Sequence, residues 1–185
     1  MLSIIVCSRN KVLLSKLARN IELTSGGALY ELIAIDNSEG QYSIFSAYSK
    51  GIKSAIGNII CFMHEDVSIE TNGWMQSVES IFDKNVEIGL LGVIGDCAIP
   101  KQKPSYVGFE LPVMHYQQQY GNRIQLVESN IDFYDKERLC RVVAVDGLWF
   151  CIPRNLFVNQ VVSFDDSFFH GYSSLCFCRA LPLRV

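Results

Sequence analysis

The clearest folding signal in this chain of 185 residues lies at Ile59-Ile60-Cys61-Phe62-Met63-His64-Glu65-Asp66, where five apolar residues run directly into three ionisable ones. A continuous apolar run of this length predicts a strand that is covered on both faces, as the strands of a parallel sheet are. The abrupt change in polarity predicts that the strand ends at Met63. His64, Glu65 and Asp66 are then expected at the edge of the sheet.

Two earlier segments have the same organisation. Ser3 to Cys7 is an apolar run rich in β-branched residues, and the polar turn Ser8-Arg9-Asn10 follows it. Leu29 to Ile35 is a second predicted strand, which stops at Asp36-Asn37-Ser38. In sheets of this kind ligands bind beyond the carboxyl ends of the strands. We therefore expect the three polar clusters to lie at one edge of the sheet, beside a ligand.

Helical periodicity separates the predicted strands. Apolar residues recur at helical spacing over residues 12–21, and from Ser43, a predicted N-cap, to about Ala55. A third helix is predicted after Thr71 or Asn72, either of which can cap it. Strands that alternate with helices predict an α/β fold of the Rossmann type, a three-layer sandwich with a mostly parallel central sheet.

The second half of the chain is patterned differently. We predict a fourth strand over Ile88 to Ile94, although two glycines interrupt it, and a β segment over Arg141 to Ile152. Residues 95–140 contain three prolines and three consecutive glutamines, and we predict a long connection with short strands, one of them at Arg123 to Glu128. Pro153 suits the first turn of a short helix.

Composition narrows the class of protein. Apolar residues make up 49% of the chain and charged residues 19%, which fits one folded domain over residues 1–185. The net charge is −3 and Lys and Arg are scattered, so we expect no nucleic-acid partner. No apolar run reaches the roughly 18 residues of a membrane helix, so no transmembrane segment is expected. Seven cysteines without a Cys-x-x-Cys motif predict reduced, buried thiols and a cytoplasmic location.

The cluster His64-Glu65-Asp66 is the main candidate for chemistry. Carboxylates at a sheet edge can hold a divalent cation, which can bridge a diphosphate and stabilise its charge as it leaves. His64 would add a nitrogen ligand or a hydrogen bond. The alternative is a solvated loop with a carboxylate that caps a helix.

The other two clusters also have two interpretations each. Asp36 can accept hydrogen bonds from a ribose or a base edge, or it can form an ordinary Asx-turn with Asn37 and Ser38. Arg9 can meet a phosphate, helped by the amides at the helix start, or the turn can simply carry an N-cap, either Ser8 or Asn10.

Asp146 and His170 are further candidates. Asp146-Gly147 interrupts a strand, which indicates a plain β-bulge or a close approach of the backbone to a ligand, with Asp146 binding an acceptor hydroxyl or a donor sugar. His170 lies among aromatic residues, where a structural role is the alternative. The chain lacks the Gly-x-Gly-x-x-Gly, P-loop and Gly-x-Ser-x-Gly motifs, which disfavours simple NAD enzymes, P-loop ATPases and α/β-hydrolases.

Several of these segments together resemble the glycosyltransferase family 2-like group, and more narrowly its short domains in bacterial glycan and streptomycin-type biosynthesis proteins. The resemblance covers nearly the whole chain and rests on Ser3–Asn10, Ile35–Glu39, Tyr42–Tyr48 with Lys50-Gly51-Ile52, Ile60–Val67 and Val143–Gly147. It implies a GT-A fold, a UDP- or GDP-linked sugar donor, a divalent cation (Mn or Mg), a glycan acceptor and inverting transfer. It also implies a nucleotide-binding half at 1–95 and an acceptor- or sugar-side half at 96–185.

Position by position, the resemblance assigns the candidate residues. The residues expected to bind the nucleotide-sugar are Ser8, Arg9, Asp36, Asn37, Glu65, Asp66 and Gly147. His64-Glu65-Asp66 stands where the group has its Asp-x-Asp-type metal motif, with Asp66 the preferred ligand and His64 in place of the first acid. The candidate catalytic residues are Asp146 and His170.

The end of the chain departs from the pattern of this branch. Ser173 and Leu175 occupy two positions where the branch has acids. An inverting transferase needs a general base to take the acceptor's proton, and neither side chain can serve as one. A truncated or altered C-terminal part is therefore expected. A degenerate module that binds nucleotide-sugar or glycan without turnover is the alternative to a working enzyme.

Overall fold

The computed structural model describes residues 1–96, 112–120, 123–128, 139, 142 and 144–164. Its central sheet has five strands in the order β2 (Tyr30–Asp36), β1 (Leu2–Ser8), β3 (Ile59–Met63), β9 (Trp149–Pro153) and β4 (Leu91–Gly92). β1 pairs in parallel with β2 and β3, whereas β9 pairs antiparallel with β3 and β4. All of these strands except β9 therefore run in one direction, which confirms the mostly parallel sheet.

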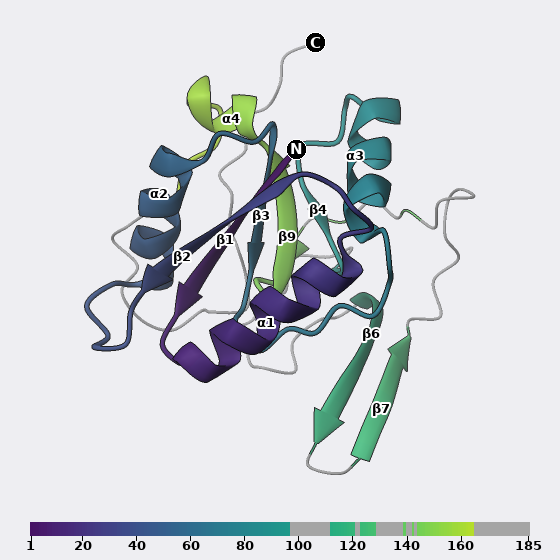
Figure 1. The fold of residues 1–185 in the computed structure, drawn as a ribbon. Helices are drawn as coiled ribbons and strands as arrows, with labels where there is room; N and C mark the ends of the chain where they lie inside the picture. Colours follow the sequence, from purple (N-terminus) through teal and green to yellow (C-terminus); the bar gives the residue numbers. More distant parts are fainter. Residues whose placement is uncertain (97–111, 121–122, 129–138, 140–141, 143, 165–185) are drawn as a thin grey trace, which may run out of the picture.

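Helices cover both faces of this sheet (Figure 1). α1 (Lys11–Thr24) and α3 (Trp74–Lys84) pack on one face, where Leu17, Ile21, Met75 and Val78 meet alternate residues of β1 and β3. α2 (Ile44–Ser54) and α4 (Arg154–Val158) pack on the other face. The structure thus has the three layers that the sequence predicted, in a GT-A-like arrangement.

The core differs between the two faces. On the side of α2 it is largely aromatic, with the ring of Phe62 4.8 Å from those of both Tyr48 and Phe150. On the side of α1 and α3 it includes Cys61 and Cys151, two buried free thiols in register with each other on β3 and β9. The predicted burial of the cysteines is confirmed for this pair.

Two of the three predicted helix caps are confirmed. Asn10 accepts hydrogen bonds from the amides of Val12 and Leu13, at 2.9 and 3.2 Å. Ser43 accepts one from the amide of Ser46 at 3.1 Å.

The prediction of the third cap is wrong, because Gly73, and neither Thr71 nor Asn72, is the N-cap of α3. Gly73 has a positive φ of 74°, and its amide donates to the carbonyl of Thr24 at 2.8 Å. A contact with the end of α1, together with a backbone conformation that glycine adopts readily, therefore sets the start of this helix.

The predicted fourth strand is divided between two sheets. β4 belongs to the central sheet, whereas β5 (Ile94–Asp96) pairs in a second sheet of order β7-β6-β5-β8 with β6 (Pro112–Tyr120), β7 (Arg123–Glu128) and β8 (Ala144–Val145). β7 has the predicted bounds, whereas β6 is a strand of nine residues in a segment where only short strands were expected. A proline at the first position of a strand removes no ladder bond that the strand needs, so Pro112 does not prevent β6.

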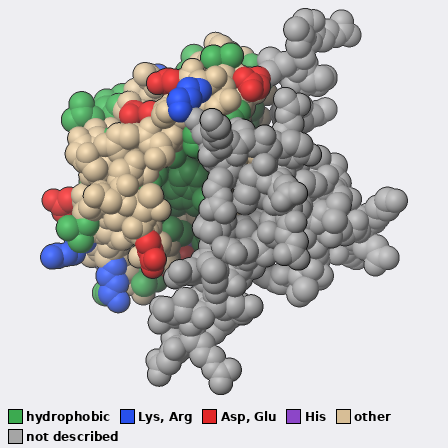
Figure 2. Space-filling view, turned by 90° about the vertical axis from the view of Figure 1, so that its right-hand side faces the viewer, with side chains coloured by type: hydrophobic (Ala, Val, Ile, Leu, Met, Phe, Trp, Pro, Cys, Tyr) green, Lys and Arg blue, Asp and Glu red, His purple; other side chains and the backbone are tan. Residues whose placement is uncertain are grey.

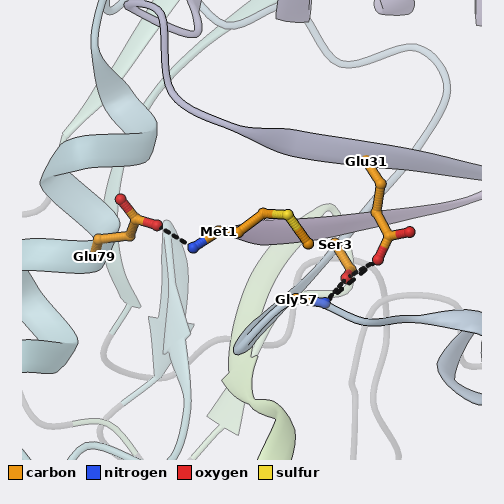
Figure 3. A network of polar contacts seen from close by, with 5 residues as sticks. All are labelled: Met1, Ser3, Glu31, Gly57 and Glu79. Atoms are coloured by element: carbon orange, nitrogen blue, oxygen red, sulfur yellow. Dashed lines mark hydrogen bonds and ion pairs between the residues drawn. The ribbon is translucent and has the colours of Figure 1, made fainter.

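The amino edge of the central sheet is closed by polar contacts (Figure 3). The carboxylate of Glu31 accepts hydrogen bonds from the hydroxyl of Ser3 and from the amide of Ile56, the latter at 2.7 Å. The amide of Gly57 donates to the Ser3 hydroxyl at 2.8 Å. At the same edge the amino group of Met1 lies 2.6 Å from the carboxylate of Glu79. Polar side chains at this edge are thus engaged with one another.

We expect Glu31→Gln to destabilise the protein at neutral pH by less than about 1 kcal/mol, because solvent screens this carboxylate. Burial opposes ionisation of Glu31, but the hydrogen bonds from Ser3, Ile56 and Gly57 hold its pKa below the ordinary value. A lowered folded pKa adds stability above the unfolded pKa, and this stability is lost as the pH falls through the folded pKa. Urea unfolding at pH 7 and pH 3 measures the difference. An equal loss at both pH values would contradict the prediction, and the exposed Glu22→Gln is the control.

Candidate functional site

The three polar clusters lie side by side at the carboxyl edge of the central sheet. Ser8 at the end of β1 is in register with Asp36 at the end of β2, and the amide of Asn37 donates to the carbonyl of Ser8 at 2.7 Å. β3 is the other neighbour of β1 and ends at Met63. The loop that follows β3 reaches the end of β1 through Glu65. The strands therefore bring the three clusters together, as predicted.

Glu65 joins the loop after β3 to the turn between β1 and α1. Its Oε2 atom accepts hydrogen bonds from the Ser8 hydroxyl at 2.7 Å, the Arg9 amide at 3.1 Å and the Asn10 amide at 3.0 Å. A carboxylate at this place also interacts favourably with the positive end of the dipole of α1. The amides that were expected to meet a phosphate thus donate to a side chain of the protein.

Arg9 keeps its guanidinium at the surface of this edge. The residue is exposed, and a methyl group placed on Gly40 would lie 3.7 Å from its Nη2 atom. Arg9 therefore extends from the turn after β1 across to the loop between β2 and α2. Its guanidinium, rather than the helix amides, is the positively charged group that this turn offers to an anion.

Asp36 and Asn37 are adjacent but differ in role. The carboxylate of Asp36 is exposed and accepts a hydrogen bond from the amide of Ser38 at 2.9 Å, which is the Asx-turn that was one of its two interpretations. The backbone and side chain of Ser38 hold the pKa of Asp36 below its ordinary value, with a small contribution from Lys11. Asp36 is thus an ionised acceptor at the edge.

Asn37 is buried, and its side chain closes the loop between β2 and α2. Its Nδ2 donates to the carbonyl of Tyr42 at 3.0 Å, and its Oδ1 accepts from the amide of Tyr42 at 2.9 Å. Both ends of the amide are therefore engaged by the loop backbone. The expected contact between Asn37 and a nucleotide stays a prediction, and in this arrangement the side chain supports the loop.

His64 and Asp66 differ in their access to solvent. Asp66 is exposed, whereas the Nε2 atom of His64 is buried and has no hydrogen-bond partner among the residues that the structure describes. The amide of His64 donates to the carbonyl of Leu148 at 3.0 Å, which continues the pairing of β3 with β9. His64 is therefore anchored to the sheet, and Asp66 is the first exposed residue of the loop.

The side chains at this edge provide only some of the ligands that a divalent cation needs. Within the described part of the chain, no group of three or more His, Cys, Asp or Glu side chains is placed to hold a metal ion. Magnesium is usually bound through one or two carboxylates together with substrate phosphates, and the exposed Asp66 fits such a role. The Nε2 atom of His64 is buried in this arrangement, so within His64-Glu65-Asp66 the exposed side chain that a cation can reach from solvent is Asp66.

Asp146 and Gly147 lie in the turn between β8 and β9, beside the start of the loop after β3. The amide of Asp146 donates to the carbonyl of Ile94 at 2.9 Å, and its Oδ1 accepts from the amide of Leu148 at 2.8 Å. Burial raises the pKa of Asp146 above its ordinary value of 3.8, although the Leu148 amide and the nearby His64 act in the opposite direction. A partly buried carboxyl group thus adjoins His64.

Comparison with known families identifies the type of protein. A sequence model of a protein family, described as a glycosyltransferase-like family, matches residues 3–177 of the chain. The chain belongs to this family. A search of curated proteins finds no significant match. Family membership supports a glycosyltransferase-type function, with a sugar donor and an acceptor as substrates in general, and it confirms the resemblance to the family 2-like group.

Two further observations on this glycosyltransferase-like protein concern its surface charge and its helices. In the space-filling view, the acidic and basic side chains of the described residues lie scattered and form no continuous basic patch on that face (Figure 2). Among the described residues, no helix is both long enough and apolar enough to span a bilayer.

Some predicted residues lie outside the described part of this glycosyltransferase-like chain, and one important residue was missed. His170, Ser173 and Leu175 lie outside the described residues. Asn20 was missed: its Nδ2 donates to the carbonyl of Ile69 at 2.9 Å, and its Oδ1 accepts from the amide of Ile69 at 2.8 Å. The available signal was an amide side chain beside the apolar positions of an amphipathic helix.

We expect Asp146→Asn to raise the melting temperature by about 2–4 °C at pH 8, as a gain of about 1 kcal/mol does in a protein of this size. Asparagine keeps an acceptor for the Leu148 amide and removes a partly buried charge. Burial raises the pKa of Asp146 in the folded protein, so the neutral carboxyl group is fully tolerated below the ordinary value of 3.8. As the pH rises through the folded pKa, the partly buried group becomes charged and the folded protein loses stability. The gain should therefore shrink towards pH 3. Thermal unfolding across this range tests the sign, and a variant less stable than the native protein at pH 8 would contradict it.

Proposed function

We propose that this protein transfers a sugar from a UDP- or GDP-linked donor to a glycan acceptor, with inversion and with the help of a divalent cation. The observation that carries the proposal is the arrangement of Arg9, Asp36 and Asp66, three exposed charged residues from separate strand ends, along one edge of a GT-A-like sheet. Membership of the glycosyltransferase-like family supports the reaction type. The motifs that resemble short bacterial glycan-biosynthesis domains support a bacterial glycan as the acceptor.

The donor site combines three different interactions. The ionised carboxylate of Asp36 accepts hydrogen bonds from a ribose or base edge, and the guanidinium of Arg9 faces a phosphate. Asp66 would supply one carboxylate ligand to Mn²⁺ or Mg²⁺, with further oxygens from the diphosphate. When bound, the cation offsets the negative charge that develops on the departing diphosphate. Residues 1–95 thus form the nucleotide half, and residues 96–185 the half that meets sugar and acceptor.

Asp146 and Gly147 belong to the sugar side of this arrangement. They lie next to His64, on the opposite flank of the β3 end from Ser8 and Asp36. A carboxyl group with a raised pKa is better matched to proton exchange near neutral pH than an ordinary aspartate. Asp146 is accordingly our candidate for the group that takes the proton of the acceptor hydroxyl, and His170 is the other candidate.

Calorimetry with UDP, GDP and their sugars, with and without Mn²⁺, tests the proposal. We expect metal-dependent binding of one nucleotide class in a range of about 1 μM to 1 mM, where enzymes commonly hold their substrates. ADP serves as the control nucleotide. A folded sample that binds none of the uridine or guanosine compounds would overturn the proposal.

A degenerate module that binds the donor without turnover is the second candidate, and Ser173 and Leu175 at two expected acid positions favour it. It predicts nucleotide binding without donor hydrolysis or transfer. A product assay on the native chain separates the two candidates, because transfer by the native protein rules out the binding module. The variant Ser173→Asp/Leu175→Asp should gain activity only if the lost acids are the reason for inactivity.

A further inference from the structure

The loop that carries Asp66, residues 64–73, is hydrogen-bonded at three points to α1 and to the turn that precedes it. At its start, Glu65 bonds to the turn at Ser8, Arg9 and Asn10. In its middle, Ile69 forms two hydrogen bonds with the side chain of Asn20, at 2.8 and 2.9 Å. At its end, the Gly73 amide bonds to the carbonyl of Thr24 at 2.8 Å. The loop therefore follows α1 from its first turn to its last.

The length of the helix can be compared with the reach of this loop. From Asn10 to Thr24 the helix rises by about 21 Å. A chain from Glu65 to Gly73 reaches at most about 28 Å when fully extended. The loop contains a turn in which the Val67 amide donates to the His64 carbonyl at 3.4 Å, and its anchors at both ends and in the middle restrict the paths open to the rest of it. Asp66 directly follows the first of these anchors, so the contacts of Glu65 restrain the backbone from which the Asp66 side chain extends.

The same anchor also fixes Arg9. Two of the three donors to Glu65 Oε2 are the backbone amides of Arg9 and Asn10, and the third is the hydroxyl of Ser8. One carboxylate oxygen thus joins the end of β1 to the loop after β3. It holds the residue proposed to face a phosphate next to the residue proposed to ligate the cation.

We propose that Glu65, supported by Asn20, is a positioning residue that holds Asp66 and Arg9 in the arrangement that a cation-bound diphosphate requires. This inference rests on the proposed function for the nature of the ligand, and it replaces the expectation that Glu65 itself contacts the nucleotide-sugar. Groups that orient a metal ligand typically contribute 10- to 100-fold to metal affinity, and preorganisation of this kind lowers the cost of ordering a site on binding.

The experiment compares four variants in the full chain with the nucleotide that the native protein prefers and Mn²⁺. We expect Glu65→Ala to weaken metal-dependent binding about 10- to 100-fold. Glu65→Gln keeps an oxygen acceptor for the two amides and should restore part of this loss. Asn20→Ala should weaken binding to a smaller extent. The control is Gln76→Ala, which removes the hydrogen bond of 2.8 Å from the Gln76 side chain to the carbonyl of Gly26, beyond the end of the loop. This variant should bind within about twofold of the native value.

Hydrogen exchange in metal-free protein provides a second readout, which needs no ligand. Glu65→Ala should speed exchange at the amides of Arg9 and Asn10, and Asn20→Ala should speed it at the amide of Ile69. Unchanged exchange at these amides would overturn the inference, even if nucleotide binding were lost. A native protein that binds no nucleotide but shows the expected exchange would instead overturn the proposed function and leave the anchoring established.

Two results would show that Glu65 contributes only to the general stability of the protein. One is a loss of binding in Gln76→Ala equal to that in Glu65→Ala, and the other is the absence of any rescue by Glu65→Gln. If Glu65→Ala fails to fold, Glu65→Gln and Asn20→Ala give the decision, because each removes only part of the anchoring. In that case, native-like binding and exchange in both variants would overturn the inference.

Discussion

Gly51→Ala is expected to destabilise this protein by about 3 kcal/mol, the upper end of the usual cost of overpacking a core. Gly51 lies in the C-terminal half of α2, where it faces the buried Ile5 of β1. A Cβ atom at this position would lie 2.4 Å from Cγ2 of Ile5 and 3.1 Å from its Cδ1. Alanine favours a helix over glycine by about 1 kcal/mol, but a contact this short outweighs that gain.

Urea unfolding measures this effect, with Ser54→Ala as the control. Ser54 is an exposed residue of the same helix, so its replacement gains helix propensity without a new contact. The double variant Ile5→Ala/Gly51→Ala should be less destabilised than the sum of its two single variants, because the smaller side chain makes room for the new methyl group. A Gly51→Ala protein as stable as Ser54→Ala would show that α2 moves away from the sheet at little cost.

The parts of the fold that were predictable depend on local patterns. β3 has the predicted bounds, Ile59–Met63, and every one of its residues is buried. Such a run is readable because burial on both faces requires each side chain to be apolar. The caps at Asn10 and Ser43 were readable for a similar reason, since a capping side chain bonds to amides two or three residues away.

The features that were missed depend on contacts between distant parts of the chain. α3 begins after Gly73 because the end of α1 fixes that residue, and no pattern near residue 73 encodes Thr24 as its partner. The segment around Gly92 passes from one sheet to another, and this is decided by pairing with β9 and β6 rather than by its own apolar character.

The same distinction applies to the candidate site. Strand ends brought the three polar clusters to one edge, and the sequence was sufficient to predict this. It was not sufficient to separate their roles, because Glu65 and Ser8 are 57 positions apart and Asn20 and Ile69 are 49 apart. Three acidic or polar side chains that looked equally able to meet a ligand divide, in the structure, into an exposed Asp66, an anchoring Glu65 and a loop-closing Asn37.

Asp66→Asn is expected to have the largest effect on function, a loss of at least about 100-fold in metal-dependent nucleotide binding. Residues that only orient a ligand contribute 10- to 100-fold to metal affinity, and removal of the ligand's own charge should exceed that range. A 100-fold loss corresponds to about 2.8 kcal/mol. Because Asp66 is exposed, its replacement should change the free energy of unfolding by less than about 0.5 kcal/mol.

Glu70→Gln is the matched control for this variant. Glu70 is also exposed and lies in the same loop, but beyond the anchor at Ile69 and away from the Glu65 contact. Isothermal titration with Mn²⁺ should show native binding in Glu70→Gln and almost none in Asp66→Asn. Equal binding in both would mean that the cation, if it is bound at all, does not use this loop. The comparison does not depend on turnover, so it applies equally to an active transferase and to a module that only binds the donor. It therefore tests the donor site separately from the question of the catalytic base.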